Sequence, residues 1–268
     1  MKLSIITINY NNCSGLQRTI ESVISQTWKD FEWIVVDGGS TDGSLEIIKR
    51  YASYFSWWCS EPDKGIYNAM NKGISHAKGE YINFLNSGDC YYNTEALSKL
   101  FNKTFREDII ICDALIMYDC HEVLFCNASS CNYDYEFFMS GSLPHQASFF
   151  KCSVFDKFGL YDESLKIVAD WKYFIEAIYF GSATTKYIPV KICLYEGNGI
   201  STGEAMQKER QFVADQLFHP RIQKDISILS NYKEELLFIK QSRITRNLYN
   251  LIYRLACVII SIRAILKK

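Results

Sequence analysis

Three aspartates stand where apolar segments of the chain end, and their side chains could do chemistry. Asp37 follows the apolar run Trp33–Val36, Asp89 follows the run Tyr81–Leu85 after a short polar turn, and Asp170 follows an apolar pair. Ligands of open α/β sheets bind just beyond the carboxyl ends of the strands, where Asp37 and Asp89 are expected. A carboxylate there can accept a hydrogen bond from an N–H group, hold a divalent cation or take a proton from a hydroxyl.

Each of these aspartates also has a purely structural interpretation. Aspartate is common in turns and at helix N-caps, so Asp37 and Asp89 could close turns and Asp170 could cap the helix that follows it. Two strand ends of one parallel sheet nevertheless carry acids beside Gly and Ser. We therefore expect a ligand site at this edge, and a capping role for Asp170 is compatible with a chemical one.

A sugar nucleotide matches the chemistry of these side chains. Its base offers N–H groups, from which the Asp37 carboxylate could accept a hydrogen bond. The charge of its diphosphate can be neutralised by a divalent cation that one or two carboxylates hold, and Asp89 is suited to that role. Asn86, three residues earlier, could reach the ribose or a water bound to the cation.

The elements that position these residues follow a strand–helix rhythm in the first part of the chain. Ser14 is a suitable N-cap for the first helix. Strands that alternate with helices of this length predict βαβ units and a mainly parallel sheet. The expected strands are 3–8, 31–36, 57–60 and 81–85, and the expected helices are 16–26, 44–54 and 65–77.

The rhythm changes after about residue 110. The expected elements here are an antiparallel pair at 109–118 and 122–126, strands at 146–151 and 184–195, and helices at 153–158 and 170–180. From Met206 the pattern is helical to the end. The glycine-rich segment Gly197–Gly203 predicts either a linker or a loop that closes over a diphosphate through its N–H groups.

Composition excludes several classes of protein. The chain has 268 residues, of which 48% are hydrophobic, enough for one large core. Its net charge of −1 gives no general attraction to nucleic acid. The ten cysteines are scattered without a CxxC pair, so we expect reduced thiols rather than a zinc site or a disulfide framework. Met1–Asn9 is too short an apolar stretch, and becomes polar too soon, for a signal peptide; its apolar character suits a first strand. The expected location is cytoplasmic.

Several motifs in their order resemble those of family 2 glycosyltransferases with the GT-A fold. The matching segments are Ser4–Asn11, Ser25–Trp28, Val36–Gly43, Glu61–Gly73 and Phe84–Asp89, and the resemblance covers roughly residues 1–200. It is greatest to the branch that acts in bacterial capsule, colanic-acid-like and O-antigen assembly. The resemblance implies one Rossmann-like, mixed but mainly parallel sheet flanked by helices, in a domain at 1–203, with a helical extension at 204–268.

The resemblance also implies roles for individual residues. Asp37 matches the acid that contacts the base, Asp89 the last acid of the metal-binding DxD-type motif, and Asp170 the catalytic base of inverting members. His145, which follows a proline, is expected to contact the acceptor or the diphosphate, although a structural hydrogen bond explains it equally well. The residues implied in nucleotide-sugar binding are Thr7, Asn9, Asp37, Asp63, Lys64, Asn86 and Ser87, and the implied cofactor is Mg²⁺ or Mn²⁺.

Two positions depart from the family pattern. Gly38 stands where the family often has a second aspartate, and the segment Asn86–Asp89 stands where it often has Asp-x-Asp-Asp. Only one acid therefore remains at the metal motif, and a second ligand would have to come from elsewhere. A single aspartate with diphosphate oxygens and waters is enough for Mg²⁺.

The implied activity is inverting transfer of a sugar from a nucleotide-sugar, with a UDP-sugar as the expected donor, to a hydroxyl of a glycan or lipid-linked glycan during surface polysaccharide synthesis. The alternative is a catalytically silent nucleotide-sugar-binding or scaffold protein of the same fold. The missing second acids favour this alternative slightly, and the retained Asp37, Asp89 and Asp170 oppose it. A nucleotidyltransferase is disfavoured because the loop Asn9–Gly15 carries no cation. A processive synthase is disfavoured because a Gln-x-x-Arg-Trp segment is absent.

The C-terminal segment 243–268 predicts a basic amphipathic helix. From Leu236 onward there are seven Lys/Arg and no Asp or Glu. The apolar run Leu255–Ile262 is far shorter than the ~20 residues needed to span a bilayer, so we expect the helix to lie on anionic lipid, at the inner face of the plasma membrane. Packing on its own domain, or on a second copy in a homo-oligomer, is the alternative.

Overall fold

The structure is a computed structural model that describes residues 1–118, 121–125, 132–197 and 203–241. The chain divides into two compact units, Met1–Gln211 and one that begins at Phe212. Residues 198–202 of the linker or loop predicted at Gly197–Gly203, and the basic helix predicted at 243–268, lie outside the described residues. Among the helices that are described, none combines the length and apolar character required to cross a membrane.

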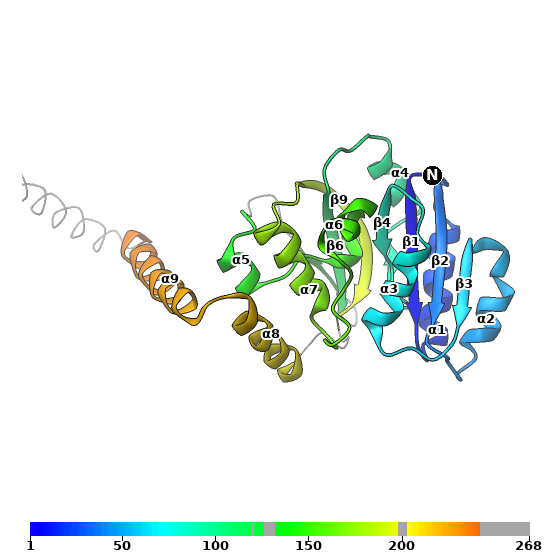
Figure 1. The fold of residues 1–268 in the computed structure, drawn as a ribbon. Helices are drawn as coiled ribbons and strands as arrows, with labels where there is room; N and C mark the ends of the chain where they lie inside the picture. The colour runs from blue at the N-terminus through cyan, green and yellow to red at the C-terminus, as the bar shows by residue number, and fades with distance from the viewer. Residues whose placement is uncertain (119–120, 126–131, 198–202, 242–268) are drawn as a thin grey trace, which may run out of the picture. The chain divides into compact units, whose positions relative to one another are not determined.

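The described elements follow the predicted alternation of strands and helices (Figure 1). They are β1 (Leu3–Asn9), α1 (Cys13–Ile24), β2 (Phe31–Asp37), α2 (Ser44–Arg50), a 3₁₀ turn (Ala52–Tyr54), β3 (Trp57–Ser60), α3 (Ile66–His76), β4 (Tyr81–Phe84), β5 (Cys90–Tyr91), α4 (Ala96–Phe101), β6 (Ile109–Tyr118), β7 (His121–Phe125), α5 (Tyr135–Ser140), a 3₁₀ turn (His145–Ala147), β8 (Ser148–Lys151), α6 (Cys152–Phe158), α7 (Ala169–Phe174), a π-helical turn (Ile175–Phe180), β9 (Thr185–Glu196), α8 (Glu204–Leu217) and α9 (Pro220–Gln241).

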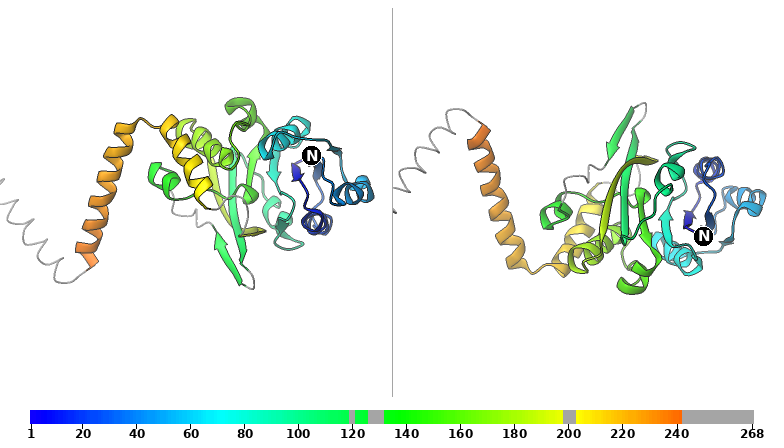
Figure 2. Two further views of the ribbon diagram at one scale, coloured as in Figure 1. Left: turned by 90° about the horizontal axis from the view of Figure 1, so that it is seen from below. Right: turned by 90° about the horizontal axis from the view of Figure 1, so that it is seen from above.

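The strands form one mixed sheet, and the expected α/β fold class is confirmed. Among the described residues the sheet has nine strands in the order β3-β2-β1-β4-β8-β6-β9-β5, with β7 paired to β6. The first four of these are parallel to one another, and β8 joins β4 in the antiparallel sense. The predicted antiparallel pair, β6 and β7, is present and extends away from the rest of the sheet (Figure 2).

The strand register brings polar side chains together at one edge. Asn9 pairs with Asp37, and Asp37 pairs with Ser60, so the carboxyl ends of β1, β2 and β3 coincide. The residues of β1 that precede Asn9, and those of β2 from Glu32 on that precede Asp37, are buried, and most of them are apolar. The edge is therefore fixed by the core behind it.

Helices cover both faces of the sheet. One face packs apolar residues of β1 and β2 against α1, α2 and α4 in a single buried cluster, which includes Leu3, Ile5, Leu16, Ile20, Trp33, Val35, Ile48 and Leu100. On the other face, Ile6 contacts Gly73 of α3 so closely that a Cβ at Gly73 would lie 2.4 Å from the Ile6 side chain. Phe84 and Phe150 pack there with aromatic rings of α6 and α7. The site edge lies at the end of this three-layer core.

Two of the differences between the predicted and the observed helices have a clear physical cause. Helix α1 begins at Cys13, and its cap is Asn12 rather than Ser14, because the Asn12 side chain accepts a hydrogen bond from the Gly15 N–H at 3.1 Å. The segment expected to be helical from 206 is two helices, since Pro220 cannot donate the backbone hydrogen bond that would continue α8. The short elements β5, α4 and α5 were not predicted, because segments of two to six residues carry too little periodicity.

Candidate active site

A cleft of about 1020 Å³ opens at the carboxyl ends of β1 and β4, within the unit Met1–Gln211. It brings together most of the residues predicted to form a site. Those that line it are Asn9, Asp63, Asn86, Ser87, Asp89, His145 and Asp170. Thr7, Asp37 and Lys64 are not among its lining residues. The Thr7 hydroxyl instead donates to the Leu85 carbonyl at 2.8 Å inside the sheet.

Asp37 is fully buried and closes the turn after β2. Its carboxylate accepts hydrogen bonds from the Asn9 amide at 2.7 Å, from the Ser60 hydroxyl at 2.6 Å, and from both the N–H and the hydroxyl of Ser40 at 3.0 and 2.6 Å. Burial alone would raise the pKa of Asp37, but the bonds from Ser40, Ser60 and Asn9 outweigh it and lower the pKa. Asp37 therefore links the ends of β1, β2 and β3 through hydrogen bonds. Its contact with a base remains a prediction.

Asp170 lies at the second position of α7 and faces the cleft. The N-cap of α7 is Val168, so capping does not explain Asp170. Its Oδ1 accepts a hydrogen bond from the Tyr67 hydroxyl at 2.8 Å, and its Oδ2 lies 3.1 Å from Nδ1 of His145. Burial acts to raise the pKa of Asp170, but the His145 and Tyr67 interactions outweigh it and lower the pKa. The carboxylate is therefore ionised, oriented and still in contact with the cleft.

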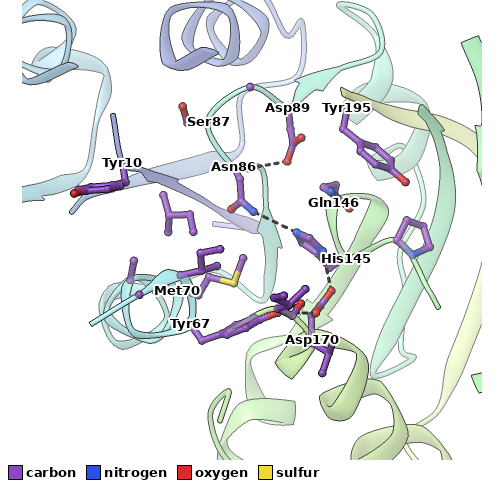
Figure 3. Close-up of a pocket in the computed structure, with 18 of the residues that line it drawn as sticks. Tyr10, Tyr67, Met70, Asn86, Ser87, Asp89, His145, Gln146, Asp170 and Tyr195 are labelled. Carbon is purple, nitrogen blue, oxygen red and sulfur yellow. Dashed lines mark hydrogen bonds and ion pairs between the residues drawn. The ribbon is translucent and has the colours of Figure 1, made fainter. Parts of the chain in front are cut away.

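His145 links Asp170 to the metal motif. In Figure 3, Asn86, His145 and Asp170 form a row, and Tyr67 approaches Asp170 from the side. The Asn86 Nδ2 lies 3.3 Å from His145 Nε2, which accepts from it in the neutral imidazole because Nδ1 donates to Asp170. Burial opposes the charged form of His145, yet the hydrogen bond to Asp170 and the charges of Asp170 and Asp89 outweigh it and raise the pKa of the imidazole.

Asp89 is buried at the end of the β4–β5 turn. Its Oδ2 accepts a hydrogen bond from the Asn86 N–H at 3.2 Å. Burial raises the pKa of Asp89 to about 7, and the nearby His145 reduces this shift. A buried carboxylate with a raised pKa is stabilised in its charged form when a cation binds beside it, and such groups are typical of functional sites.

The oxygen atoms around Asp89 fit a hard divalent cation. Across the described parts of the chain, no group of three or more His, Cys, Asp or Glu side chains converges on a common point. The Oδ1 atom of Asn86, however, is buried and has no hydrogen-bond partner. One carboxylate and one amide oxygen are the kind of protein ligands that Mg²⁺ takes when substrate phosphates supply the rest.

Two site residues come from α8 and were not predicted. The Glu209 carboxylate accepts three backbone hydrogen bonds, from the N–H groups of 166, 167 and 168 at 2.8, 2.7 and 3.0 Å. Arg210 lines the cleft and places its guanidinium 5.0 Å from the centre of the Trp171 ring, while its Nε is buried without a hydrogen-bond partner. No motif in the sequence marks these residues, because their role depends on α8 packing against the loop before α7.

The loop before α7 should depend on Glu209. Replacing Glu209 with alanine leaves three N–H groups without an acceptor, so we expect a loss of about 1–3 kcal/mol in the free energy of unfolding and a lower kcat through displacement of Asp170. The matched control is Glu204→Ala on the same helix, where the side chain is 79% exposed and, among the described residues, forms an ion pair with Lys208 alone. Denaturant unfolding and steady-state kinetics check both. Equal behaviour of the two variants would contradict this role.

Comparison with known proteins agrees with the geometry. Residues 4–155 match the sequence model described as glycosyl transferase family 2. An uncharacterized glycosyltransferase of Mycobacterium tuberculosis is 32% identical over 209 residues, which cover 75% of this chain and 77% of that protein. A PGL/p-HBAD biosynthesis glycosyltransferase of Mycobacterium bovis is 27% identical over 221 residues, covering 77% of this chain and 81% of that protein.

Solved structures share the fold. TarS of S. aureus (residues 1–349) in complex with UDP-GlcNAc superposes with a TM-score of 0.64 at 18% identity, over 82% of this chain and 67% of that chain. The mannosyltransferase PcManGT of Pyrobaculum calidifontis, in complex with GDP-Man and Mn²⁺, gives a TM-score of 0.57 at 16% identity, over 78% of this chain and 60% of that chain. In another crystal structure of TarS (residues 1–349), the match covers 66% of the TarS chain, which is just under two thirds of its length.

Proposed function

Since this chain belongs to glycosyltransferase family 2, we propose that it transfers a sugar from a nucleotide-sugar, with a UDP-sugar as the expected donor, to a hydroxyl of a glycan or lipid-linked glycan. The observation that carries the proposal is the row of Asn86, His145 and Asp170 beside Asp89 in one cleft. The UDP-GlcNAc complex of TarS supports a nucleotide-sugar donor for this fold.

The proposed reaction is a single displacement with inversion. The acceptor oxygen attacks the anomeric carbon, its proton passes to the Asp170 carboxylate, and the bond from that carbon to the diphosphate oxygen breaks with its electron pair on the diphosphate. Tyr67 and His145 each hold one Asp170 oxygen, so the remaining lone pairs of the carboxylate are directed. General-base catalysis of this kind contributes typically about 10²–10⁴ in rate.

Asp89 and the free Oδ1 of Asn86 are the residues that we propose to hold Mg²⁺ or Mn²⁺. Such an ion, when bound, supplies positive charge that stabilises a departing diphosphate. The Mn²⁺ complex of PcManGT supports a divalent cation in this fold. In the proposed arrangement His145 contacts Asn86 and thereby keeps its oxygen turned away from the imidazole.

A role in surface polysaccharide or glycolipid synthesis belongs to the same proposal. One relative is a PGL/p-HBAD biosynthesis glycosyltransferase, which supports an acceptor made during envelope assembly. The acceptor would then be lipid-linked, and a cytoplasmic enzyme attached to the inner face of the plasma membrane would meet it there. The basic segment 243–268 is the proposed means of attachment, and packing of this segment on its own domain or on a second copy of the chain is the alternative.

Removing the basic segment should weaken membrane binding. A protein truncated after Gln241 loses six of the seven Lys/Arg near the C-terminus. Since each cation near an anionic surface contributes roughly 1 kcal/mol, we expect at least about 100-fold weaker sedimentation with phosphatidylserine vesicles and no change with neutral ones. Replacing Arg243, Arg246 and Arg254 with glutamine should give a graded loss. Unchanged vesicle binding by both variants would assign the segment to protein packing instead.

The proposed activity is separated from the silent-scaffold alternative by a transfer assay. The full chain is incubated with UDP-, GDP- and dTDP-sugars and Mg²⁺ or Mn²⁺, and release of the nucleoside diphosphate is measured. A glycosyltransferase releases the diphosphate from one donor class, slowly to water and faster with an acceptor. A silent protein binds a nucleotide-sugar but releases no nucleoside diphosphate from it.

A further inference from the structure

Helix α3 presents three polar side chains to the segment that precedes α7. Tyr67, Asn68 and Asn71 each form a hydrogen bond with a residue of the segment 161–168. Side chains four residues apart on a helix point to the same side, so Tyr67 and Asn71 share one face of α3. The segment leads directly into α7 and Asp170, and its placement therefore sets the placement of the proposed base.

The two ends of this segment are fixed to α3. At its beginning, the Asn71 Nδ2 donates to the Tyr161 carbonyl at 2.9 Å, and the Asn71 Oδ1 accepts from the Tyr161 N–H at 3.0 Å. At its end, the Tyr67 hydroxyl lies 2.6 Å from the Ile167 carbonyl and 2.8 Å from Oδ1 of Asp170. Asn71 and Tyr67 are both buried, so these two anchors belong to the core of the protein.

Glu163 connects the middle of the segment to the same helix. Its Oε1 accepts a hydrogen bond from Asn71 at 2.9 Å, and its Oε2 accepts one from Asn68 at 2.8 Å. These two bonds lower the pKa of Glu163, so the carboxylate is ionised at neutral pH. Glu163 is exposed, and Asn71 keeps its bonds to Tyr161 without it. We therefore expect the carboxylate to contribute little to the free energy of unfolding.

We propose that Glu163 is a positioning residue for Asp170, which holds the segment 161–168 against α3 so that the Asp170 carboxylate meets the acceptor hydroxyl. The inference rests on the proposed role of Asp170 as the base and adds the residue that sets its position. A misplacement of about 1 Å at a reacting group can lower a rate by about 10²-fold. The rate of transfer is therefore expected to depend on Glu163 far more than stability does.

Asn68 extends the connection to the loop before α3. Its Oδ1 accepts a hydrogen bond from the Lys64 N–H at 3.2 Å, and the preceding residue, Asp63, lines the cleft. Asn68 thus contacts a loop that forms part of the cleft wall and also contacts Glu163. Replacing Asn68 with alanine should change both kcat and the affinity for the nucleoside diphosphate, whereas replacing Glu163 should change kcat alone.

The variant Glu163→Ala tests the inference in the full-length protein. The rate is the release of nucleoside diphosphate from whichever UDP-, GDP- or dTDP-sugar the unaltered protein turns over. We expect kcat to fall about 10–100-fold, with the affinity for UDP or GDP, measured by isothermal titration, within about twofold of the unaltered protein. Glu163→Gln keeps one acceptor oxygen and should give an intermediate rate.

The matched control is Asp162→Asn, which removes an acid from the adjacent position of the same segment. Asp162 bonds to Ser164 and Lys172, neither of which belongs to α3. This variant should keep kcat within about twofold of the unaltered protein, as expected for a surface change that leaves the contacts with α3 in place. Thermal melting by circular dichroism verifies that each variant is folded.

A second comparison isolates the path through Asp170. Glu163→Ala is combined with Asp170→Asn, and the rate of the double variant is compared with that of Asp170→Asn alone. If Glu163 acts by placing the base, its loss has no further effect once the base is gone, and the two rates should agree within about twofold. A merely structural contribution would instead lower the rate by the same factor in both backgrounds.

The outcomes separate the inference from the proposed function. Full activity of Glu163→Ala, or a further loss of rate when it is added to Asp170→Asn, overturns the inference while the glycosyltransferase proposal stands. A loss of nucleotide affinity in Glu163→Ala as large as its loss of kcat also overturns it. If the unaltered protein releases no nucleoside diphosphate from any donor, the proposed function itself is wrong, and the inference with it.

Discussion

Replacing Asp170 with asparagine is expected to lower kcat about 10²–10⁴-fold and to leave the affinity for the nucleoside diphosphate within about twofold. The amide cannot take the proton of the attacking hydroxyl. It is also a poorer partner for Nδ1 of His145, which lies 3.1 Å from Oδ2, and for the Tyr67 hydroxyl, 2.8 Å from Oδ1. Steady-state kinetics and nucleotide titration measure the two quantities separately.

Two control variants isolate the chemical role of Asp170. Asp162→Asn removes an acid from the loop before the same helix, where it pairs with Lys172 at 2.6 Å, and should leave kcat within a small factor. Tyr67→Phe removes one hydrogen bond from Asp170 but keeps the base, so its loss of kcat should be intermediate. If Asp170→Asn retains near-full transfer activity while folded, Asp170 is not the base.

Replacing Asp89 with asparagine is expected to abolish most of the transfer activity and, in metal-free protein, to stabilise the fold. Activity falls because the proposed ion loses its one carboxylate ligand. Stability rises because the buried carboxylate, with its pKa raised to about 7, is ionised at neutral pH only at a cost. We expect a gain of about 1–4 kcal/mol in the free energy of unfolding at pH 8.

Replacing Asp37 with asparagine should instead lower the free energy of unfolding, because the Asp37 carboxylate accepts four hydrogen bonds.

The pH dependence of this stability has a definite sign. Between the ordinary value of 3.8 and about 7, folded Asp89 holds a proton that the unfolded chain has released. The folded state therefore binds more protons in this window, and the contribution of Asp89 to stability falls as the pH rises through it and is constant above. Chemical unfolding with chelator at pH 5 and pH 8 should show the difference between unaltered protein and Asp89→Asn widen with pH. A constant difference would contradict the raised pKa.

The strand ends were predictable because each apolar run marks a strand in the sequence and parallel strands end at the same edge of a sheet. The runs before Asp37 and Asp89 are apolar, and parallel strands end at one edge of the sheet, so the meeting of Asn86 and Asp89 in a cleft follows from sequence and topology. Asp170 could be assigned only through the family resemblance. Its cleft position depends on how α7 packs, which no local pattern encodes.

The hydrogen bonds of Asp37 and the role of Glu209 could not be predicted from the sequence. Asp37 sits at a strand end like Asp89, yet its oxygens are taken by Asn9, Ser40 and Ser60, and this follows from the register of three strands. Glu209 enters the site because α8 packs against the loop before α7, 41 to 43 residues earlier in the chain. Contacts of such separation are decided by tertiary packing, which outweighs local propensity.

The central claim is that this cleft catalyses sugar transfer with Asp170 at the reacting carbon. The most direct measurement is the release of nucleoside diphosphate from a panel of UDP-, GDP- and dTDP-sugars by unaltered protein and by Asp170→Asn, with Mg²⁺ or Mn²⁺ present and with chelator. We predict metal-dependent release from one donor class by the unaltered protein, and tight binding with release lowered at least about 10²-fold by Asp170→Asn. Binding of a nucleotide-sugar by both proteins, with equal release or none from either, would contradict the account.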